Sequence, residues 1–460
     1  MTQSETLKVL KMGENVFLTG AAGSGKTYVL NEYIKFLKEH EIGVAVTAST
    51  GIAATHLKGV TIHSWSGIGI KDRLSDKDLD DMEQRRYLWK RYEKTNVLII
   101  DEISMLSVAT LDLIDRVAKH FNRNSKPFGG MQVIFSGDFF QLPPIEKKVT
   151  ENIAPEEYQE KIIFMDEEEE EITGTPFAFK SKSWRDANLH ICYLSEQYRQ
   201  NDIEFSNLLG EIRDGTFSKK SLDILNKRII KNEDEEITKL YTHNVNVDSF
   251  NNKKIGEIDE QERGYKMLTK GKAPLIESLK RGCLVPENLL LKKGALVMFV
   301  KNNPAVGYIN GTVGRIVTFV GPYPMVECDD GERYLAKPQT WCIEDGGKIL
   351  AEIEQIPLKL AWAVTVHKSQ GMTLDKAVID LSGAFVEGQG YVAISRVKNL
   401  KGLFLKGFNQ KALEVHDEII STDKKLKEES NKLFDEMKKI KVKEFKERHD
   451  VFLKKVRGKK

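Results

Sequence analysis

Residues 20–27, GAAGSGKT, constrain the fold more than any other part of the chain. They place Gly, Lys and Thr as in a phosphate-binding loop that joins a buried strand to a helix. The apolar run VFL precedes them, and the amphipathic run YVLNEYIKFLKEH follows. The glycines let backbone N–H groups turn toward phosphate oxygens, and the helix presents its positive end to the same anion. We therefore expect a nucleoside triphosphatase domain built on a parallel sheet.

An apolar strand that ends in two carboxylates supplies the chemistry expected beside this loop. In VLIIDE, residues 97–102, Asp101 and Glu102 stand at the strand tip. Lys26 would neutralise β- and γ-phosphate charge, while Thr27 and Asp101 offer the oxygen ligands that Mg²⁺ prefers. Glu102 is placed to orient and deprotonate an attacking water, so hydrolysis is favoured over nucleotide storage.

The transition state of phosphoryl transfer calls for a further cation and a residue that positions the water. Gln141 in SGDFFQLPP is uncharged, so it would position water or sense the γ-phosphate. Arg199 in LSEQYRQ and Arg396 in YVAISRV lie in later segments, and either could reach across a cleft as an arginine finger. An arginine at such a place is also commonly a surface or ion-pairing residue, and the sequence leaves both interpretations open.

Apolar runs alternate with amphipathic stretches over the first 150 residues, which is typical of an α/β fold. Strand-like segments return at ITKLYTHN and KLAWAVTVHKSQG, and short alternating strands bounded by Gly, Asn and Pro lie between them. This order predicts two parallel-sheet domains, with a small antiparallel β-barrel inserted in the second. The predicted limits are 1–190 for the first domain, with a charged insertion at 58–94, then 191–255 and 355–415 for the second domain, 256–354 for its β-rich insertion, and 416–460 for a basic helical extension.

Charge is distributed unevenly along the chain. The net charge is +2, but residues 421–460 carry 15 Lys and Arg against 8 Asp and Glu, so the preceding residues sum to −5. A polyanion partner must therefore be held by local basic patches. The acidic run at 166–171 is interpreted as a solvated surface loop. For the basic extension, two interpretations stay open: a packing helix with a solvated face, or a DNA clamp.

Localisation is indicated by what the sequence lacks. No apolar run approaches the roughly 20 residues of a membrane span, and the N-terminal residues lack the apolar core of a signal peptide. The four cysteines are scattered without a Cys-x-x-Cys pair, which indicates neither a disulfide framework nor a zinc site. We expect a cytoplasmic protein that is not secreted and has no membrane partner.

A series of motifs from residue 3 to residue 396 resembles, in order, those of the petite-integration-frequency DNA helicases. TASTGIAA at 47–54 and GVTIHSWSGIG at 59–69 look like the DNA-contacting motifs of that family. EISMLSVATLDLID at 102–115 resembles the signature that separates the family from other helicases. SGDFFQLPP, LSEQYRQ, TVHKSQGMTL and YVAISR follow in the family's order, and GYINGTVG at 307–314 looks like part of its small β-barrel.

The resemblance implies a role for each matched residue. For ATP, these are the loop residues Gly20, Ala22, Gly23, Ser24, Gly25, Lys26 and Thr27, the catalytic Asp101, Glu102 and Gln141, the fingers Arg199 and Arg396, the adenine-reading Gln3, and the coupling residues Gln370 and Gly371. For single-stranded DNA, they are Thr50, Gly51, His63, Trp65, Thr365, His367 and Lys368. Trp65 stands where the family often has Phe, which keeps a face for base stacking. A Trp65 buried in the core is the open alternative.

The resemblance also implies the activity. It predicts two RecA-like P-loop domains with ATP between them, and a superfamily-one, RecD-related helicase that moves 5′ to 3′ on single-stranded DNA. ATP and Mg²⁺ are the expected cofactors, and single-stranded DNA and tailed or forked duplex are the expected partners. We expect a monomer without an obligatory protein partner, serving DNA repair, recombination or replication and resolving G-quadruplexes. Residues 58–94 are interpreted as the wedge that separates the strands.

Rival functions differ in what they require of the sequence. A guanine-nucleotide switch needs Asn-Lys-x-Asp, and the Asn-Lys pairs at residues 226, 252 and 431 lack the Asp. A binding scaffold with a decayed ATPase would have lost catalytic residues, yet all of the predicted ones are present. RNA as the track stays open, because backbone gripping and base stacking occur on both nucleic acids.

Overall fold

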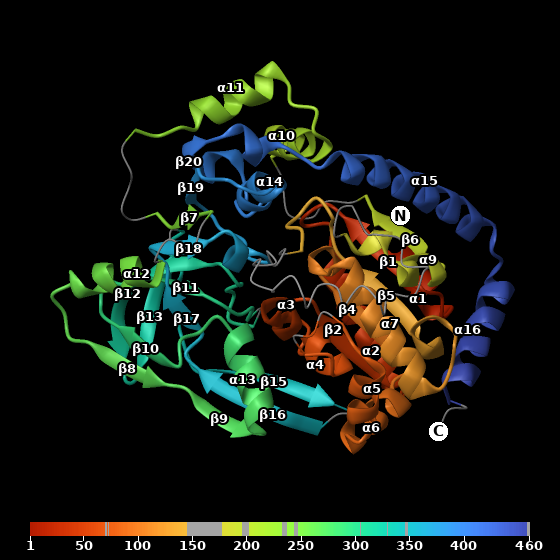
Figure 1. The fold of residues 1–460 in the computed structure, drawn as a ribbon. Coiled ribbons are helices and arrows are strands. Elements are labelled where there is room, and N and C mark those ends of the chain that lie inside the picture. The colour runs from red at the N-terminus through yellow and green to blue at the C-terminus, as the bar shows by residue number, and fades with distance from the viewer. Residues whose placement is uncertain are drawn as a thin grey trace, which may run out of the picture.

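The computed structural model describes residues 1–69, 71, 73–144, 177–195, 202–231, 237–242, 247–303, 305–328, 330–345 and 348–457. A six-stranded parallel sheet forms the centre of the first domain (Figure 1). Its strands, in order across the sheet, are β3 (Val60–Thr61), β2 (Val44–Ala48), β4 (Val97–Asp101), β5 (Gln132–Ser136), β1 (Val16–Gly20) and β6 (His190–Leu194). In β4, Val97 and Ile99 face one apolar cluster while Leu98 and Ile100 face another. The apolar runs are therefore buried on both faces, as predicted.

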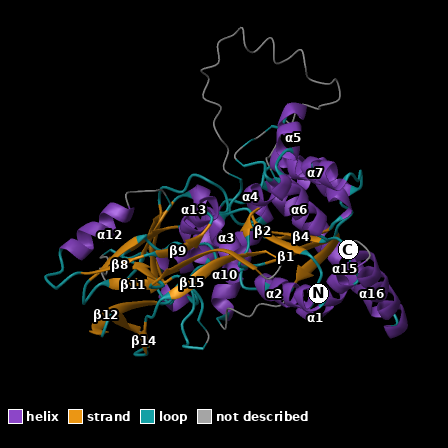
Figure 2. Cartoon of the chain, turned by 90° about the horizontal axis from the view of Figure 1, so that it is seen from below, coloured by secondary structure: helices purple, strands orange, loops and turns teal. Residues whose placement is uncertain are grey.

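Helices cover both faces of this sheet (Figure 2). α1 (Gln3–Lys11) and α2 (Lys26–Glu39) pack on one face, and α7 (Val108–Asn122) packs on the other. The other helices in the described part of this domain are α3 (Gly51–His56), α4 (Ile62–Ser66), α5 (Asp76–Glu83), α6 (Arg86–Lys94) and α9 (Lys182–Asp186). Residues 58–94, predicted as an insertion, contain the edge strand β3 and the helices α4, α5 and α6.

The second domain is built on a four-stranded parallel sheet. Its strands, in order, are β18 (Ala363–Thr365), β7 (Lys239–Tyr241), β19 (Ala377–Leu381) and β20 (Leu403–Phe408). Its helices are α10 (Ile203–Asp214), α11 (Lys219–Lys227), α12 (Val247–Gly256) and α14 (Gln389–Ile394). Two parallel sheets in one chain confirm the predicted α/β architecture.

Antiparallel sheets form the insertion between β7 and β18. The largest consists of β14 (Arg333–Leu335), β13 (Tyr323–Cys328), β12 (Val313–Val320), β11 (Leu296–Phe299) and β17 (Leu358–Leu360). The two smaller sheets pair β15 (Gln339–Asp345), β16 (Lys348–Gln355) and β9 (Leu268–Gly271), and β10 (Asn288–Leu291) with β8 (Arg263–Lys266). Helix α13 (Ala273–Gly282) packs between the insertion and α3. The predicted β-rich insertion is confirmed.

Two predicted domain limits shift in the structure. The first sheet extends to Leu194 rather than residue 190, because all five residues of β6 pair with β1. The insertion extends to Leu360 rather than residue 354, because β17 pairs with β11. A short strand has the same apolar pattern in either of two neighbouring sheets. The sequence pattern therefore could not assign β6 and β17 to the correct sheet.

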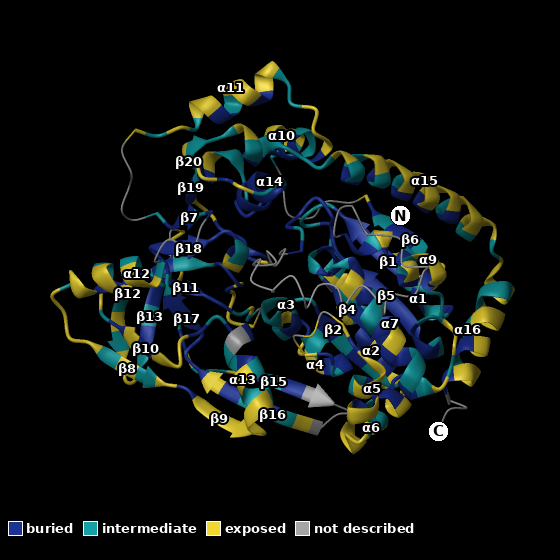
Figure 3. Ribbon diagram, viewed as in Figure 1, coloured by how far each residue is buried: buried dark blue, intermediate teal, exposed yellow. Residues whose placement is uncertain are grey.

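The predicted C-terminal extension forms two helices, α15 (Asp417–Lys439) and α16 (Val442–Arg457). One face of α15 is buried and the other is exposed (Figure 3). Phe452 and Val456 of α16 join the apolar cluster that α1 and α2 form over the first sheet. Short 3-10 helices complete the fold: η1 (Ile103–Met105), η2 (Pro127–Gly130), η3 (Ala178–Lys180), η4 (His367–Ser369), η5 (Leu400–Gly402) and η6 (Gln410–Leu413). Over the described part of the chain, no helix has the length and apolarity to span a bilayer.

Candidate active site

The phosphate loop connects β1 to α2 and depends on its glycines. Gly20, Gly23 and Gly25 have φ angles of 144°, 84° and 91°, which side chains with a Cβ rarely adopt. A Cβ on Gly25 would lie 2.1 Å from Nε2 of Gln3, and one on Gly20 would lie 2.7 Å from the Leu194 carbonyl oxygen. The tight loop thus leaves its concave side to backbone N–H groups and the N-terminus of α2, which suits a phosphate.

Lys26 is the first residue of α2, and its side chain turns back into the loop. Its Nζ donates hydrogen bonds to the carbonyl oxygens of Gly20 at 2.7 Å and Ala21 at 3.1 Å. Burial lowers the pKa of Lys26, and the nearby carboxylates, led by Asp138 and Glu102, act against that shift. Thr27, the next residue, exposes its side chain at the mouth of the cleft.

Asp101 and Glu102 lie at the carboxyl end of β4, opposite the loop. Burial raises the pKa of Asp101, and the charge of Lys26 acts against it. Burial raises the pKa of Glu102 to about 7, and the neighbouring charge of Asp101 adds to this shift. Glu102 has φ 52°, a left-handed conformation that turns the chain away from the strand. A carboxyl group with a pKa near neutrality is well matched to accept a proton from water.

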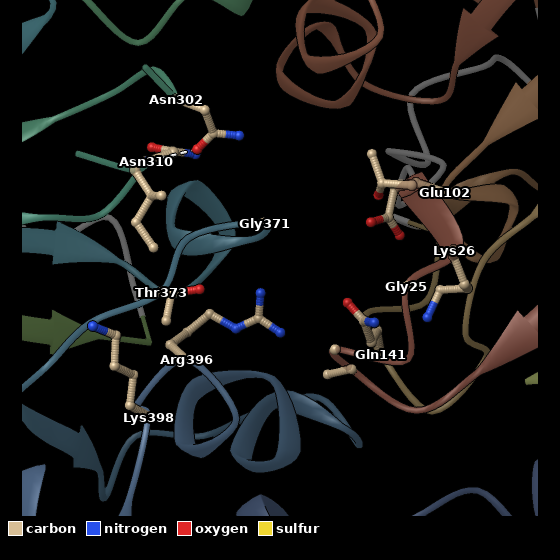
Figure 4. Close-up of a pocket in the computed structure, with 14 residues that line it drawn as sticks. Gly25, Lys26, Glu102, Gln141, Asn302, Asn310, Gly371, Thr373, Arg396 and Lys398 are labelled. Atoms are coloured by element: carbon tan, nitrogen blue, oxygen red, sulfur yellow. Dashed lines mark hydrogen bonds between the residues drawn. The ribbon is translucent and has the colours of Figure 1, made fainter. Parts of the chain in front are cut away.

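The opposite wall of the cleft comes from the second domain and its insertion (Figure 4). The cleft has a volume of about 580 Å³. From the second domain it is lined by Gly371, Thr373, Arg396 and Lys398, and from the insertion by Asn302, Ile309 and Asn310. The guanidinium of Arg396 is held by Nε donating to Val392 O and Nη2 donating to Ser395 Oγ, both at 2.9 Å. The Arg396 side chain extends toward the wall that carries Lys26 and Gln141.

Gln370 connects the two walls directly. Its Nε2 donates to Oε1 of Gln141 at 3.3 Å and to Oε2 of Glu102 at 3.5 Å. A residue of the second domain thus touches both side chains predicted to handle the attacking water. Any movement between the domains must change these contacts.

The donor set near Lys26 suits ATP with Mg²⁺. Thr27 and Asp101 offer one hydroxyl and one carboxylate, and Mg²⁺ commonly takes one or two protein oxygens with substrate phosphates and waters. The described residues hold no group of three or more His, Cys, Asp or Glu side chains that would bind a metal without such phosphates.

Two further predicted ATP residues have different outcomes. Gln3 begins α1, and its Nε2 approaches the Ser24 carbonyl oxygen at 3.5 Å, so the side chain lies against the phosphate loop. Arg199 lies outside the described residues, as does the acidic run 166–171.

The predicted DNA-contacting residues lie on several elements. Thr50 caps α3 by accepting a hydrogen bond from the Ala53 N–H, and Gly51 is the first residue of that helix. Thr365, buried at the end of β18, accepts from the Lys368 N–H, while His367 and Lys368 form η4. A Cβ on Gly371 would lie 2.9 Å from His56 Cε1, so the turn after η4 meets α3. His63 is half-buried on α4.

Trp65 departs from the expectation of an exposed stacking face. It is only 4% exposed, and its ring packs on Tyr92 with centroids 4.7 Å apart. Tyr92 in turn stacks on Phe121 of α7, which places Trp65 in the core that holds α4 and α6 on the first domain. The buried-core alternative therefore describes this residue.

Sequence motifs missed part of the cleft. Asn302 and Asn310 belong to a Gly- and Asn-rich loop of the insertion, and the Asn310 N–H donates to Asn302 Oδ1 at 2.7 Å. The motif GYINGTVG contains Asn310, but the pattern alone gave it only a place in a β-rich unit. Lys398 lies two residues after Arg396, close enough to have been inferred from that motif.

Family profiles, related sequences and solved structures of Pif1-like helicases all match this chain. The sequence profile of PIF1-like helicases matches residues 4–223, and that of the DNA helicase Pif1 2B domain matches residues 274–319. An ATP-dependent DNA helicase Pif1 from a Psychrobacter species is 40% identical, over 97% of this chain and 74% of that protein. The structure of unliganded Pif1 from a Bacteroides species matches with a TM-score of 0.77 at 32% identity, over 93% of this chain and 97% of that one. A Bacteroides Pif1 structure bound to single-stranded DNA matches with a TM-score of 0.59, at the same identity and coverage.

Proposed function

The chain belongs to the Pif1-like family of ATP-dependent DNA helicases, and we propose that it moves 5′ to 3′ along single-stranded DNA and separates the strands of tailed or forked duplex. The observation that carries this proposal is the contact of Gln370 with Gln141 and Glu102 across the cleft. It joins the segment with the predicted DNA contacts to the groups that would activate water. We further propose that this activity serves DNA repair, recombination or replication, including the removal of G-quadruplexes.

Each wall of the cleft would have its own role in ATP hydrolysis. The phosphate loop and Lys26 bind the phosphates, and Thr27 and Asp101 would hold Mg²⁺, which supplies further positive charge beside them. Gln141 holds the attacking water in line, and Glu102 accepts its proton. Arg396 places a second cation on the opposite wall, where charge develops in the transition state.

Movement along DNA follows if the two domains change their separation during the cycle. The attraction between a bound triphosphate and Arg396 favours a closed cleft, and loss of the γ-phosphate removes that attraction. The structure here is more similar to unliganded Bacteroides Pif1 than to the DNA-bound form, with TM-scores of 0.77 and 0.59 at equal sequence identity. At constant sequence, this difference supports a change of conformation between the unliganded and the DNA-bound form.

The path of DNA would run over α3 and η4. Lys368 is exposed there, and its neighbours Thr365 and His367 lie at the end of β18. Because α3 belongs to the first domain and η4 to the second, a strand across both would be gripped on two sides of the moving cleft. The helices of residues 58–94 lie on the first domain, where α4 and α6 contact α7, and they are the proposed wedge.

The test is ATP-dependent strand separation on matched duplexes that carry either a 5′ or a 3′ single-stranded tail. We expect separation only with the 5′ tail, and none with the Lys26→Ala variant. Separation from the 3′ tail would contradict the polarity. Separation of a tailed RNA duplex at the same rate would contradict DNA as the track.

A further inference from the structure

The C-terminal extension is fixed to the first domain. Helix α15 packs along β6, the edge strand of the six-stranded sheet. Ser430 Oγ of α15 accepts a hydrogen bond of 3.0 Å from the backbone N–H of Tyr193 in β6. On α16, the His449 ring lies 2.8 Å from the Lys11 carbonyl oxygen, and Phe452 packs against Gly13. Side chains on the inner face of α15 are thus held in register with the first sheet.

One of these inner side chains is a buried carboxylate. Asp423 is 6% exposed, and its Oδ1 accepts a 3.0 Å hydrogen bond from the hydroxyl of Tyr193 and a 3.4 Å bond from Nη2 of Arg213. Lys427, one turn later on α15, pairs with Oδ2 at 2.8 Å. A buried carboxylate is stable only when its oxygens are satisfied in this way.

Arg213 brings the second domain into the same cluster. It lies on α10, which packs against α14, the helix that leads to Arg396. Arg213 is 6% exposed, and its Nη1 donates to the Tyr193 hydroxyl at 2.6 Å. Its Nη2 also donates to Oδ1 of Asp138 at 3.1 Å, and its guanidinium lies 4.0 Å from the centre of the Phe140 ring. A single guanidinium is therefore shared between a carboxylate of the extension and one of the first domain.

Asp138 connects Arg213 to the turn that carries Gln141 of the cleft. It is fully buried, and it shapes the turn of SGDFFQLPP: its Oδ1 accepts from the Phe140 N–H at 3.3 Å, and its carbonyl oxygen accepts from the Gln141 N–H at 2.9 Å. Among the carboxylates around Lys26, Asp138 acts most strongly against the lowering of the Lys26 pKa by burial. The position of Asp138 therefore sets both the backbone of Gln141 and the field around Lys26.

From these contacts we propose that Asp423 of the C-terminal extension is a positioning residue for ATP hydrolysis: it shares Arg213 with Asp138 and so fixes the loop that places Gln141 in the nucleotide cleft. The extension is then a working part of the ATPase, not only a cover on the first sheet. This inference rests on the proposed assignment of the cleft as the site of hydrolysis.

The physical reason lies in the sharing of one cation. Without the charge of Asp423, Arg213 has one buried carboxylate instead of two, and its guanidinium moves toward Asp138. The turn that holds Gln141 then shifts, and a small misplacement of a water-positioning group lowers the rate far more than it lowers nucleotide affinity.

The test compares Asp423→Asn with Asp435→Asn in the full chain. Both residues lie on α15, but Asp435 is exposed and remote from Arg213. We expect Asp423→Asn to lower the kcat of DNA-stimulated ATP hydrolysis about tenfold while the KM for ATP stays within about twofold. Asp435→Asn should match the wild type in both. Asp423→Glu, which keeps the charge, should recover part of the lost kcat.

A merely structural role gives a different result. It predicts a lower melting temperature for Asp423→Asn and an unchanged kcat per nucleotide-binding site. The number of binding sites is measured by titration with a fluorescent ADP analogue. That result would overturn the inference. If Asp423→Asn yields no folded protein, Arg213→Lys replaces it: it keeps the charge but loses the fork, and an unchanged kcat would be equally decisive. Lys26→Ala distinguishes failure of this inference from failure of the proposed function. If ATP hydrolysis survives Lys26→Ala, the assignment of the cleft as the hydrolysis site is wrong, whatever the Asp423 variants show.

Discussion

The two walls of the nucleotide cleft differ in how the chain builds them. The wall from the first domain comes largely from residues 20–27 and the strand end at 101–102. The opposite wall is assembled from three separate segments, around residues 302–310, 371–373 and 396–398. The first wall is already shaped by its own local backbone, whereas the second exists only when the second domain and its insertion are folded together.

This difference suggests that the two walls contribute differently to nucleotide affinity and to the rate of hydrolysis. A preformed loop binds phosphates equally in the ground state and the transition state, so it contributes mainly to affinity. A wall that approaches from another domain can add its charge as the reaction proceeds, so it contributes mainly to rate. Three substitutions test this comparison, beginning with the largest expected effect.

Arg396→Ala removes the cation of the second wall. We expect kcat for ATP hydrolysis to fall by about 10³-fold, because an arginine finger acts on transition-state charge. The KM for ATP should change by less than about threefold. Steady-state hydrolysis with saturating single-stranded DNA measures both.

Two variants bracket that result. Lys26→Ala should impair hydrolysis and weaken nucleotide binding together, since it removes charge from the preformed wall. Lys401→Ala, an exposed cation of the second domain outside the cleft lining, should behave as wild type. If Arg396→Ala weakens binding of a fluorescent ADP analogue as much as Lys26→Ala does, the two walls do not divide affinity from rate.

Lys368→Ala tests whether the second domain also grips the strand. Lys368 is exposed on η4, so losing one phosphate contact should weaken binding to single-stranded DNA several-fold and equally for all sequences. The slope of log affinity against log salt should fall by about one. Lys455→Ala on the exposed face of α16 is the matched control. A reduced slope for Lys455→Ala alone would assign DNA binding to the extension.

Lys359→Met gives the smallest effect and concerns the strand that leads into the second wall. Lys359 and Lys26 are both lysines with lowered pKa values, but carboxylates around Lys26 act against its shift. At Lys359, burial lowers the pKa to about 7 and the like charge of Lys368 adds to this shift, while Asp248 acts against it. Between pH 7 and the ordinary lysine pKa, the unfolded chain binds a proton that the folded chain does not. The free energy of unfolding therefore rises with pH.

Lys359→Met should lose this part of the pH dependence. From pH 7 to pH 8.5, the melting temperature of the wild type should rise by about 2 °C relative to the variant. Lys337→Met, an exposed lysine of the same insertion, should track the wild type. Parallel curves for Lys359→Met and wild type would show that Lys359 keeps its charge in the fold.

The sequence predicted the first wall well because its chemistry is local. A loop that needs positive φ at Gly23 and Gly25 must place glycine there, and a buried parallel strand must be apolar up to Asp101. The family resemblance extended this prediction to Gln370 and Arg396, which the structure places at the same cleft.

Other features depended on contacts that no local pattern encodes. The motif around Trp65 is the same whether its ring is exposed or packed on Tyr92. Only the packing of α4 against α6 and α7 determines that the ring is buried. The limits at Leu194 and Leu360 depend on which strand β6 and β17 pair with.

The sequence by itself determined the two parallel-sheet domains, the phosphate loop, the carboxylates of β4 and the helical character of the extension. All of these follow from periodicity or from backbone constraints within a few residues. Only the tertiary structure decided that Asn310 lines the cleft, that Gln370 touches Glu102 and that Asp423 shares Arg213 with Asp138. These contacts join segments far apart in the chain, and the packing of whole domains, not local preference, sets which side chains meet.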